Sequence, residues 1–150
     1  MAKQLQRSQE LGQTLMLLGR DFQQRLDRDL KQRDVQGIGT RHRAIFLFLG
    51  RKGASRAVDL AEAAGIRPQS MMKIVHELET LGLVQRCADP ADSRAKLIDF
   101  TPTGKKLIDE LSRSTETVWQ QYRQILGPEV MDVTLNNLNT LLSAGDNTSE

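Results

Sequence analysis

Side chains that can contact DNA bases or phosphates recur along one part of the sequence, residues 66–82. They are Gln69, Ser70, Met72, Lys73 and His76. The Gln69 amide can form two hydrogen bonds with adenine, and Lys73 can reach guanine or a phosphate group. Ser70 is short enough for either kind of contact, Met72 can touch a thymine methyl group, and His76 can meet phosphate, base or water. A polar face on an isolated helix is usually only solvated, so this interpretation depends on the surrounding elements.

The same stretch has the apolar spacing of a helix that buries its other side. Met71, Val75 and Leu78 recur at intervals of four and three residues, which places them opposite the candidate contacts. A proline opens the stretch at the first helical position, and a glycine closes it. Residues 56–64 predict a shorter helix that ends at a glycine, which leaves only a tight turn between the two helices. The pattern predicts a helix-turn-helix whose second helix carries the candidate contacts.

Two β-prone runs follow, residues 83–88 and 96–100, joined by the turn-rich, charged segment 89–94. They predict a hairpin with a projecting tip, and a helix-turn-helix followed by such a hairpin is a winged helix. The main candidate in the hairpin is Arg94, because an arginine at a wing tip can enter the narrow, electronegative minor groove. Further candidates for phosphate contacts are Arg67, Arg86 and Lys96, although plain surface charge explains them equally well.

The distribution of charge favours a basic lobe around these motifs. Residues 41–106 contain 12 Lys or Arg against 7 Asp or Glu, which gives this region a net charge of +5. The whole chain has a net charge of +2, so the remaining residues carry −3. This polarity is typical of a nucleic-acid-binding lobe joined to a neutral or acidic one, although solvated surface charge can also produce it.

The composition excludes several classes of protein. The chain has no run of about 18 apolar residues, and its N-terminus has lysine and glutamine where a signal peptide needs an apolar stretch. We therefore expect no membrane partner, no export and a cytoplasmic location. The single cysteine, Cys87, cannot form an intrachain disulfide or a zinc cluster, so we expect no metal site and no cofactor. With two histidines, no glycine-rich phosphate loop and no acid–base pair at readable spacing, we expect no catalytic residues and no enzyme.

The predicted fold is mainly α with a small β-hairpin wing (α+β), in a single domain over residues 1–150. A winged-helix DNA-binding lobe spans residues 40–100, and amphipathic dimerisation helices are expected within residues 1–34 and 102–144. The central lobe is too small to bury the apolar faces of these helices, so the simplest solution is a homodimer. An intramolecular bundle is the alternative. The dimer is favoured because a two-fold DNA site needs two heads at a fixed separation.

The chain resembles the MarR family of winged-helix transcriptional regulators. The resemblance rests on Leu60-Ala61-Glu62, the run LETLGLVQR at 78–86, the wing DPADSR at 89–94, and FTPTG at 100–104. It implies a homodimeric repressor that binds double-stranded DNA at a pseudo-palindromic operator and is released by a small effector. It also implies that Asp92 holds the guanidinium of Arg94 in place.

The resemblance further implies an effector pocket between the dimer helices and the winged lobe, suited to a small aromatic or anionic molecule. The candidate lining residues are Phe22, His42, Phe46 and Trp119, although core packing explains aromatic residues at helical spacing better. Two other functions stay open. One is a thiol-based redox-sensing regulator acting through Cys87, for which a half-buried structural cysteine is the simpler interpretation. The other is a winged-helix module that binds proteins and has no role on DNA.

Overall fold

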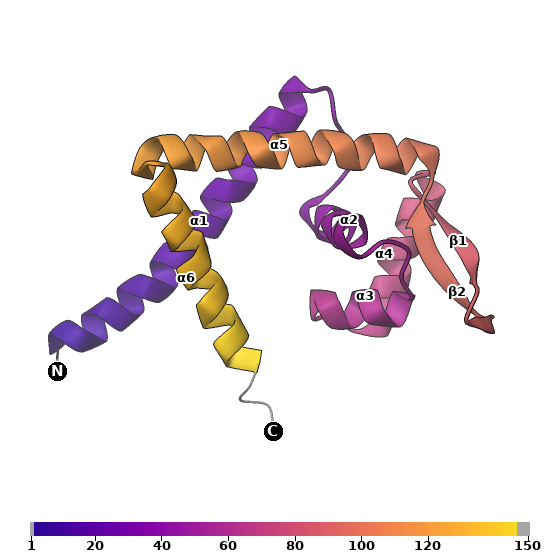
Figure 1. The fold of residues 1–150 in the computed structure, drawn as a ribbon, viewed down its shortest axis with the longest axis horizontal. Helices are drawn as coiled ribbons and strands as arrows, with labels where there is room; N and C mark the ends of the chain where they lie inside the picture. The colour runs from indigo at the N-terminus through magenta and orange to yellow at the C-terminus, as the bar shows by residue number, and fades with distance from the viewer. Residues whose placement is uncertain (1, 147–150) are drawn as a thin grey trace. The chain divides into compact units, whose positions relative to one another are not determined.

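The computed structural model describes residues 2–146 (Figure 1). Its elements are, in order, α1 (Ala2–Gln32), α2 (Thr40–Lys52), α3 (Ala57–Ala64), α4 (Pro68–Thr80), β1 (Val84–Asp89), β2 (Asp92–Phe100), α5 (Pro102–Leu126) and α6 (Pro128–Asp146). The two strands form an antiparallel hairpin. The structure confirms the prediction of a mainly helical fold with a small β-hairpin wing.

The chain divides into two compact units, and the boundary falls within α5. The first unit runs as far as Ser114 and holds α1 to α4, the hairpin and the first part of α5. The second unit begins at Thr115 and holds the rest of α5 together with α6. All the predicted DNA contacts belong to the first unit, so they lie on one compact body.

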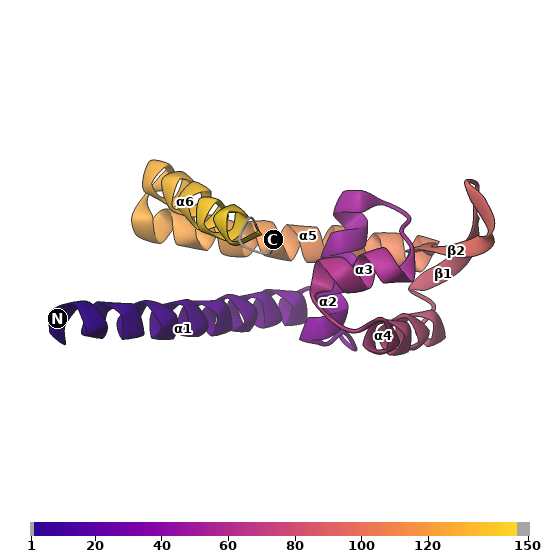
Figure 2. The ribbon, with the colours of Figure 1, turned by 90° about the horizontal axis from the view of Figure 1, so that it is seen from below.

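One apolar core joins the helix-turn-helix to the hairpin in the first unit. Phe46 of α2 is fully buried, and its ring centroid lies 5.0 Å from that of Phe100 at the end of β2. Further fully buried side chains come from α2, α3 and α4, namely Leu49, Leu60, Met71, Val75 and Leu78. These three helices and the hairpin lie together at one end of the unit, away from the start of α1 (Figures 1 and 2). Burying each large apolar side chain contributes about 1.5–3 kcal/mol, so this core fixes α4 firmly against its neighbours.

The turns around α4 form as their residue types predict. Gly65 ends α3 in the left-handed conformation with φ 64°, and α4 then begins at Pro68. At the other end Gly82 has φ 70°, and the Leu83 N–H donates to the Leu78 carbonyl at 2.9 Å. Glycine adopts positive φ without a steric penalty, which is why these two turns are tight. Both ends of α4 are therefore defined by local sequence.

The start of α5 is hydrogen-bonded to the residues that lead into β1, Gly82 and Leu83. Thr101 caps the helix: its Oγ1 accepts the Gly104 N–H at 3.0 Å and donates to the Gly82 carbonyl at 2.6 Å. The Thr101 N–H also donates to the Leu83 carbonyl at 3.1 Å. Gly104 is buried here, and a Cβ atom at this position would lie only 1.9 Å from the Leu83 carbonyl oxygen. Any larger residue would force α5 away from the hairpin.

The hairpin is longer and its turn shorter than the sequence predicted. The segment 89–94 was expected to form the turn, but only Pro90 and Ala91 separate the two strands. The strand pairing explains the difference: Ala88 lies opposite Lys96, whereas Asp89 lies opposite Asp92, with an irregularity between the two pairs. Residues 93–95 of β2 have no partner in β1 and make up this irregular part of the strand.

Large apolar side chains are exposed on helices of both units. In the first unit one group of them lies on α1, namely Leu11, Leu15, Met16, Leu17 and Leu18. In the second unit another group lies on α6, namely Val130, Val133, Leu135, Leu141 and Leu142, and Ile125 and Leu126 at the end of α5 are exposed as well. Within residues 2–146, no helix combines the length and apolar character needed to cross a membrane.

Candidate nucleic-acid interface

Helix α4, the second helix of the helix-turn-helix and here called the recognition helix, buries one side and presents the other, as its spacing predicts. Met71, Val75 and Leu78 are buried, and Ile74, which the sequence analysis did not single out, joins them at 5% exposure. The outward side chains are all exposed: Gln69, Ser70, Met72, Lys73 and His76. Arg67 is also exposed, at the position immediately before the helix. The structure therefore brings six of the predicted contact residues together on or beside one helix.

A cluster of charged and polar side chains holds α4 against α2. The Glu77 carboxylate accepts hydrogen bonds from Arg41 Nη2 at 2.8 and 2.7 Å, and His42 Nε2 lies 2.7 Å from Glu77 Oε2. The other ring nitrogen of His42, Nδ1, accepts the N–H of Gly39 at 3.3 Å, at the start of α2. Nδ1 acts as the acceptor, so Nε2 carries the proton that His42 donates to Glu77. The hydrogen bond from His42 and the charge of Arg41 hold the pKa of Glu77 below its ordinary value, although partial burial opposes them.

A second ion pair joins the end of α4 to the hairpin. Arg86 of β1 donates to Glu79 through Nε at 2.9 Å and through Nη2 at 3.2 Å. Such a two-bond arrangement fixes the orientation of both side chains. Arg86 was predicted to contact phosphate, and its charge is already shared with Glu79 in the structure.

Arg94 lies exposed in the irregular part of the hairpin. It belongs to the outer part of β2, between the positions that pair with Asp89 and Ala88. Among residues 2–146 its guanidinium has no ion-pair partner, so the charge is available to a ligand. Lys96, also exposed, lies two residues further along the strand, opposite Ala88.

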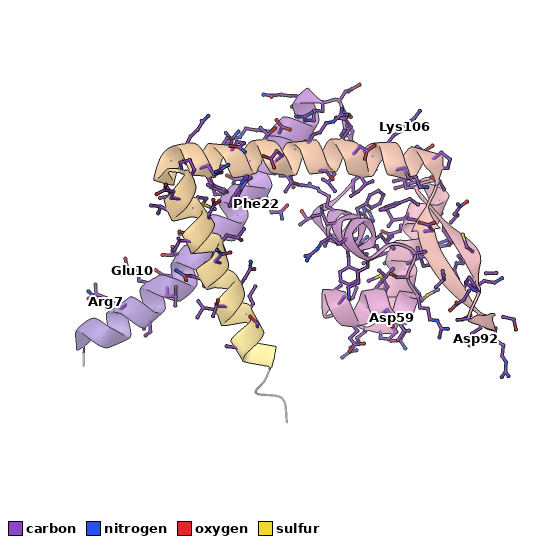
Figure 3. The ribbon with its side chains drawn as sticks, viewed as in Figure 1. Arg7, Glu10, Phe22, Asp59, Asp92 and Lys106 are labelled. Atoms are coloured by element: carbon purple, nitrogen blue, oxygen red, sulfur yellow. The ribbon has the colours of Figure 1, made fainter. Side chains whose placement is uncertain are left out.

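Asp92 acts on the backbone of Arg94, not on its side chain. Its Oδ1 accepts the backbone N–H of Arg94 at 3.0 Å, and its Oδ2 lies 3.9 Å from Arg56 Nη2. The expectation that Asp92 holds the Arg94 guanidinium is therefore corrected: the carboxylate shapes the strand that carries Arg94. Figure 3 shows Asp92 at the outer end of the hairpin.

Two of the residues predicted to line an effector pocket have structural roles. Phe46 is fully buried in the core against Phe100, and His42 connects α2 to Glu77. Phe22 is half-buried on α1, and Trp119 belongs to the second unit, where the Arg123 guanidinium lies 5.9 Å from its ring centroid. A pocket formed by these residues stays a prediction.

A different cavity lies at the far end of α4. It has a volume of about 290 Å³ and opens beside the turn that ends the recognition helix. Its lining is mainly apolar: Val35, Ile38, Leu81, Leu83 and Leu107, with polar groups from Asp34, Gln36 and Thr103. The lining contains none of the four residues nominated from the sequence.

The remaining reactive residue, Cys87, has an ordinary strand environment. It is a free, half-buried thiol in β1, and its partner in the strand pairing is Leu97. No group of three or more potential metal ligands occurs within the described part of the chain. The first unit therefore offers groups suited to binding another molecule, namely an exposed polar helix face and an exposed arginine in the hairpin.

Comparisons with known proteins agree with this geometry. A family model described as the MarR family matches residues 36–95. An uncharacterised HTH-type transcriptional regulator of Mycobacterium leprae is 25% identical over 123 residues, which cover 81% of this chain and 86% of that protein. The HTH-type transcriptional regulator FarR of Neisseria gonorrhoeae is 31% identical over 87 residues, which cover 58% of this chain and 60% of that protein.

Solved structures of other proteins have a similar fold. The crystal structure of the transcriptional regulator PA4135 has a TM-score of 0.73 and 25% identity, over 89% of this chain and 96% of that one. A MarR mutant from E. coli, solved in complex with operator DNA, has a TM-score of 0.74 and 16% identity, over 89% of this chain and 94% of that one. At this identity the second likeness is one of fold.

Proposed function

Because this chain belongs to the MarR family of winged-helix transcriptional regulators, we propose that it binds a pseudo-palindromic DNA operator as a homodimer and represses transcription. One α4 enters each of two successive major-groove turns, and each hairpin reaches the flanking minor groove. The E. coli relative solved with operator DNA has the same fold, which supports this mode of binding.

The observation that carries the proposal is the combination of α4 and Arg94. The exposed side of α4 holds Gln69, Lys73 and His76 on a helix whose other side is buried. Arg94 adds a free positive charge in the hairpin, at a place suited to a narrow minor groove. The polar face of α4 and the arginine of the hairpin lie on one unit and differ in chemistry. This combination fits duplex DNA better than it fits a flat protein surface.

The homodimer is supported by the apolar side chains that the two units leave exposed. On α1, Leu11 is 55% exposed and Met16 is 60% exposed; on α6, Leu141 is 64% exposed and Leu142 is 72% exposed. Burying apolar surface contributes about 25 cal/mol per Å² of favourable free energy. A second copy that covers these helices therefore stabilises a dimer. Two-fold pairing of identical helices is the commonest way to cover such surfaces.

Release by a small aromatic or anionic effector is the regulatory part of the proposal. Its support is the apolar cavity beside Leu81 and Leu83, because a ligand there would touch the residues that connect α4 to β1. Benzoate, used as a probe, should weaken DNA binding by the native protein but not by Leu107→Trp, whose larger side chain fills the cavity. Equal weakening in both proteins would place the effector elsewhere, and no weakening would contradict this class of effector.

Selection of bound sequences from a random pool of duplexes tests the function itself. The native protein should enrich a two-fold motif, and its affinity for that motif should fall steeply with salt, because each phosphate contact releases counterions. A Gln69→Ala variant should relax the preference at one position of each half-site. An unenriched pool with salt-independent binding would contradict the proposal and would favour a protein-interaction module.

A further inference from the structure

The start of α3 carries an arginine to which the DNA contacts assign no role. Arg56 precedes the first residue of α3 with an extended backbone, φ −70° and ψ 147°, but its side chain does not cap the helix. The side chain reaches the hairpin instead. Its Nε and Nη2 atoms donate to one oxygen, Oδ2 of Asp89, at 2.8 and 2.6 Å. A residue 33 positions away in sequence thus holds the end of β1.

Asp89 uses its two carboxylate oxygens for two different tasks. Oδ1 accepts the backbone N–H of Ala91 at 2.9 Å and so closes the hairpin turn, while Oδ2 binds Arg56. Asp89 is only 8% exposed, which is rare for a carboxylate without a charged partner. The Ala91 N–H and the Arg56 guanidinium hold the pKa of Asp89 below its ordinary value, so the carboxylate stays charged. The turn conformation and the attachment to α3 therefore depend on the same side chain.

Asp92 repeats the arrangement on the other side of the turn. Its Oδ1 fixes the backbone N–H of Arg94, and its Oδ2 lies 3.9 Å from Arg56 Nη2. Both carboxylates that shape the outer hairpin consequently face one guanidinium. Without Arg56, the two carboxylates at this end of the hairpin would lose the cation that they share.

The residue before Arg56 attaches the hairpin at a second point. The Ser55 N–H donates to the Ile98 carbonyl at 3.1 Å, and the Ile98 N–H donates to the Ser55 carbonyl at 2.8 Å. The hairpin is therefore held by main-chain bonds near its base and by the Arg56 ion pair near its turn. Removing the ion pair would leave the base in place and free only the outer part, where Arg94 lies.

We propose that Arg56 is the positioning residue of the hairpin: it holds the outer strands so that Arg94 enters the DNA groove. This inference rests on the proposed DNA-binding function. Arg56 acts through Arg94, so the two residues should not contribute independently to affinity.

Amide hydrogen exchange of the free, full-length protein tests the structural half of the proposal. Arg56→Gln removes the charge, Arg56→Lys keeps it, and Arg51→Gln removes a charge from an exposed residue of the same lobe as a matched control. Arg56→Gln should speed exchange at the Ala91 and Arg94 amides by about three- to tenfold, a change that matches the net contribution of a typical hydrogen bond to stability. Arg56→Lys should retain most of the protection, and Arg51→Gln all of it. Unchanged exchange in Arg56→Gln would overturn the proposal.

DNA affinity on a selected duplex tests the functional half. Arg56→Gln should weaken binding about three- to tenfold more than Arg51→Gln does, in conditions where circular dichroism shows both variants folded. In the Arg94→Ala background, Arg56→Gln should weaken binding no further than Arg51→Gln does. If the losses of affinity caused by Arg56→Gln and Arg94→Ala simply add in the double variant, Arg56 acts independently of Arg94. That result would overturn this proposal and leave the proposed function standing. A native protein that selects no duplex would overturn the proposed function and this proposal with it.

Discussion

Gly104→Ala tests how closely α5 is joined to the hairpin. The added methyl carbon would lie 1.9 Å from the Leu83 carbonyl oxygen and 2.9 Å from the carbonyl carbon. Such contacts essentially never fall below 3.0 Å, so α5 and Leu83 must separate by more than 1 Å. The neighbours are backbone atoms and cannot rotate away, unlike the end of a flexible side chain.

The cost follows from what this separation breaks. Overpacking in a well-packed interior costs about 1–3 kcal/mol. The movement also stretches two hydrogen bonds of Thr101, to the Leu83 and Gly82 carbonyls at 3.1 and 2.6 Å, each worth about 0.5–1.5 kcal/mol. Alanine recovers about 1 kcal/mol because it favours the helix more than glycine does. The expected net loss in the free energy of unfolding is about 3 kcal/mol.

Urea unfolding followed by circular dichroism measures this loss, with all proteins at the same chain concentration. The control is Gly12→Ala in α1, where an added Cβ meets no atom within 4 Å. That variant should be as stable as the native protein, or more stable by up to about 1 kcal/mol. If Gly104→Ala stays within about 0.5 kcal/mol of the native protein, the close approach of α5 to Leu83 is not the constraint described here.

Other parts of the first unit give three more expectations. Phe46→Ala removes a fully buried ring and should lower the free energy of unfolding in urea by about 3–5 kcal/mol; a loss below about 1 kcal/mol would contradict its place in the core. Lys73→Ala should reduce the slope of log affinity against log salt by about one, as the loss of one phosphate contact does; an unchanged slope would show that Lys73 contacts no phosphate. His42 and Arg41 lower the pKa of Glu77, so the stability supplied by the ionised carboxylate is complete above its ordinary pKa of 4.5 and is lost as the pH falls through the lowered pKa. The melting temperature of the native protein should therefore fall further in that range than that of Glu77→Gln, and equal falls would contradict the cluster's role.

The helices and turns were predictable because neighbouring residues determine them. The spacing of Met71, Val75 and Leu78 identified the buried side of α4, and Gly82 and Thr101 marked where α4 stops and α5 starts. Each of these signals acts over one or two helical turns. The sequence therefore predicted both the recognition helix and the side it presents.

The contacts that hold the recognition surface together were not predictable in the same way. Glu77 meets Arg41 from 36 positions away, and Asp89 meets Arg56 from 33 positions away. Many charged residues could have supplied these partners, and no local pattern indicates which ones the fold brings close. The sequence does indicate the turn role of Asp89, because an aspartate before a turn can accept the N–H of the residue two positions later, here Ala91. It does not indicate that Arg56 is the partner of the other carboxylate oxygen.

The predicted effector residues show a further limit of sequence reasoning. Phe46 and His42 have the residue types of a ligand pocket, yet one fills the core and the other joins α2 to α4. The same apolar or imidazole side chain serves either role, and only its neighbours decide. The apolar cavity beside Leu81 and Leu83 depends on three segments meeting, which no single stretch of sequence reveals.

Hydroxyl-radical footprinting of the native protein on its selected duplex tests the central claim most directly. Two α4 helices in successive major grooves should protect two symmetric patches of backbone about 34–36 Å apart. Arg94→Ala should remove only the outer protections, where the hairpins lie. A single asymmetric patch, or protection without two-fold symmetry, would contradict the account.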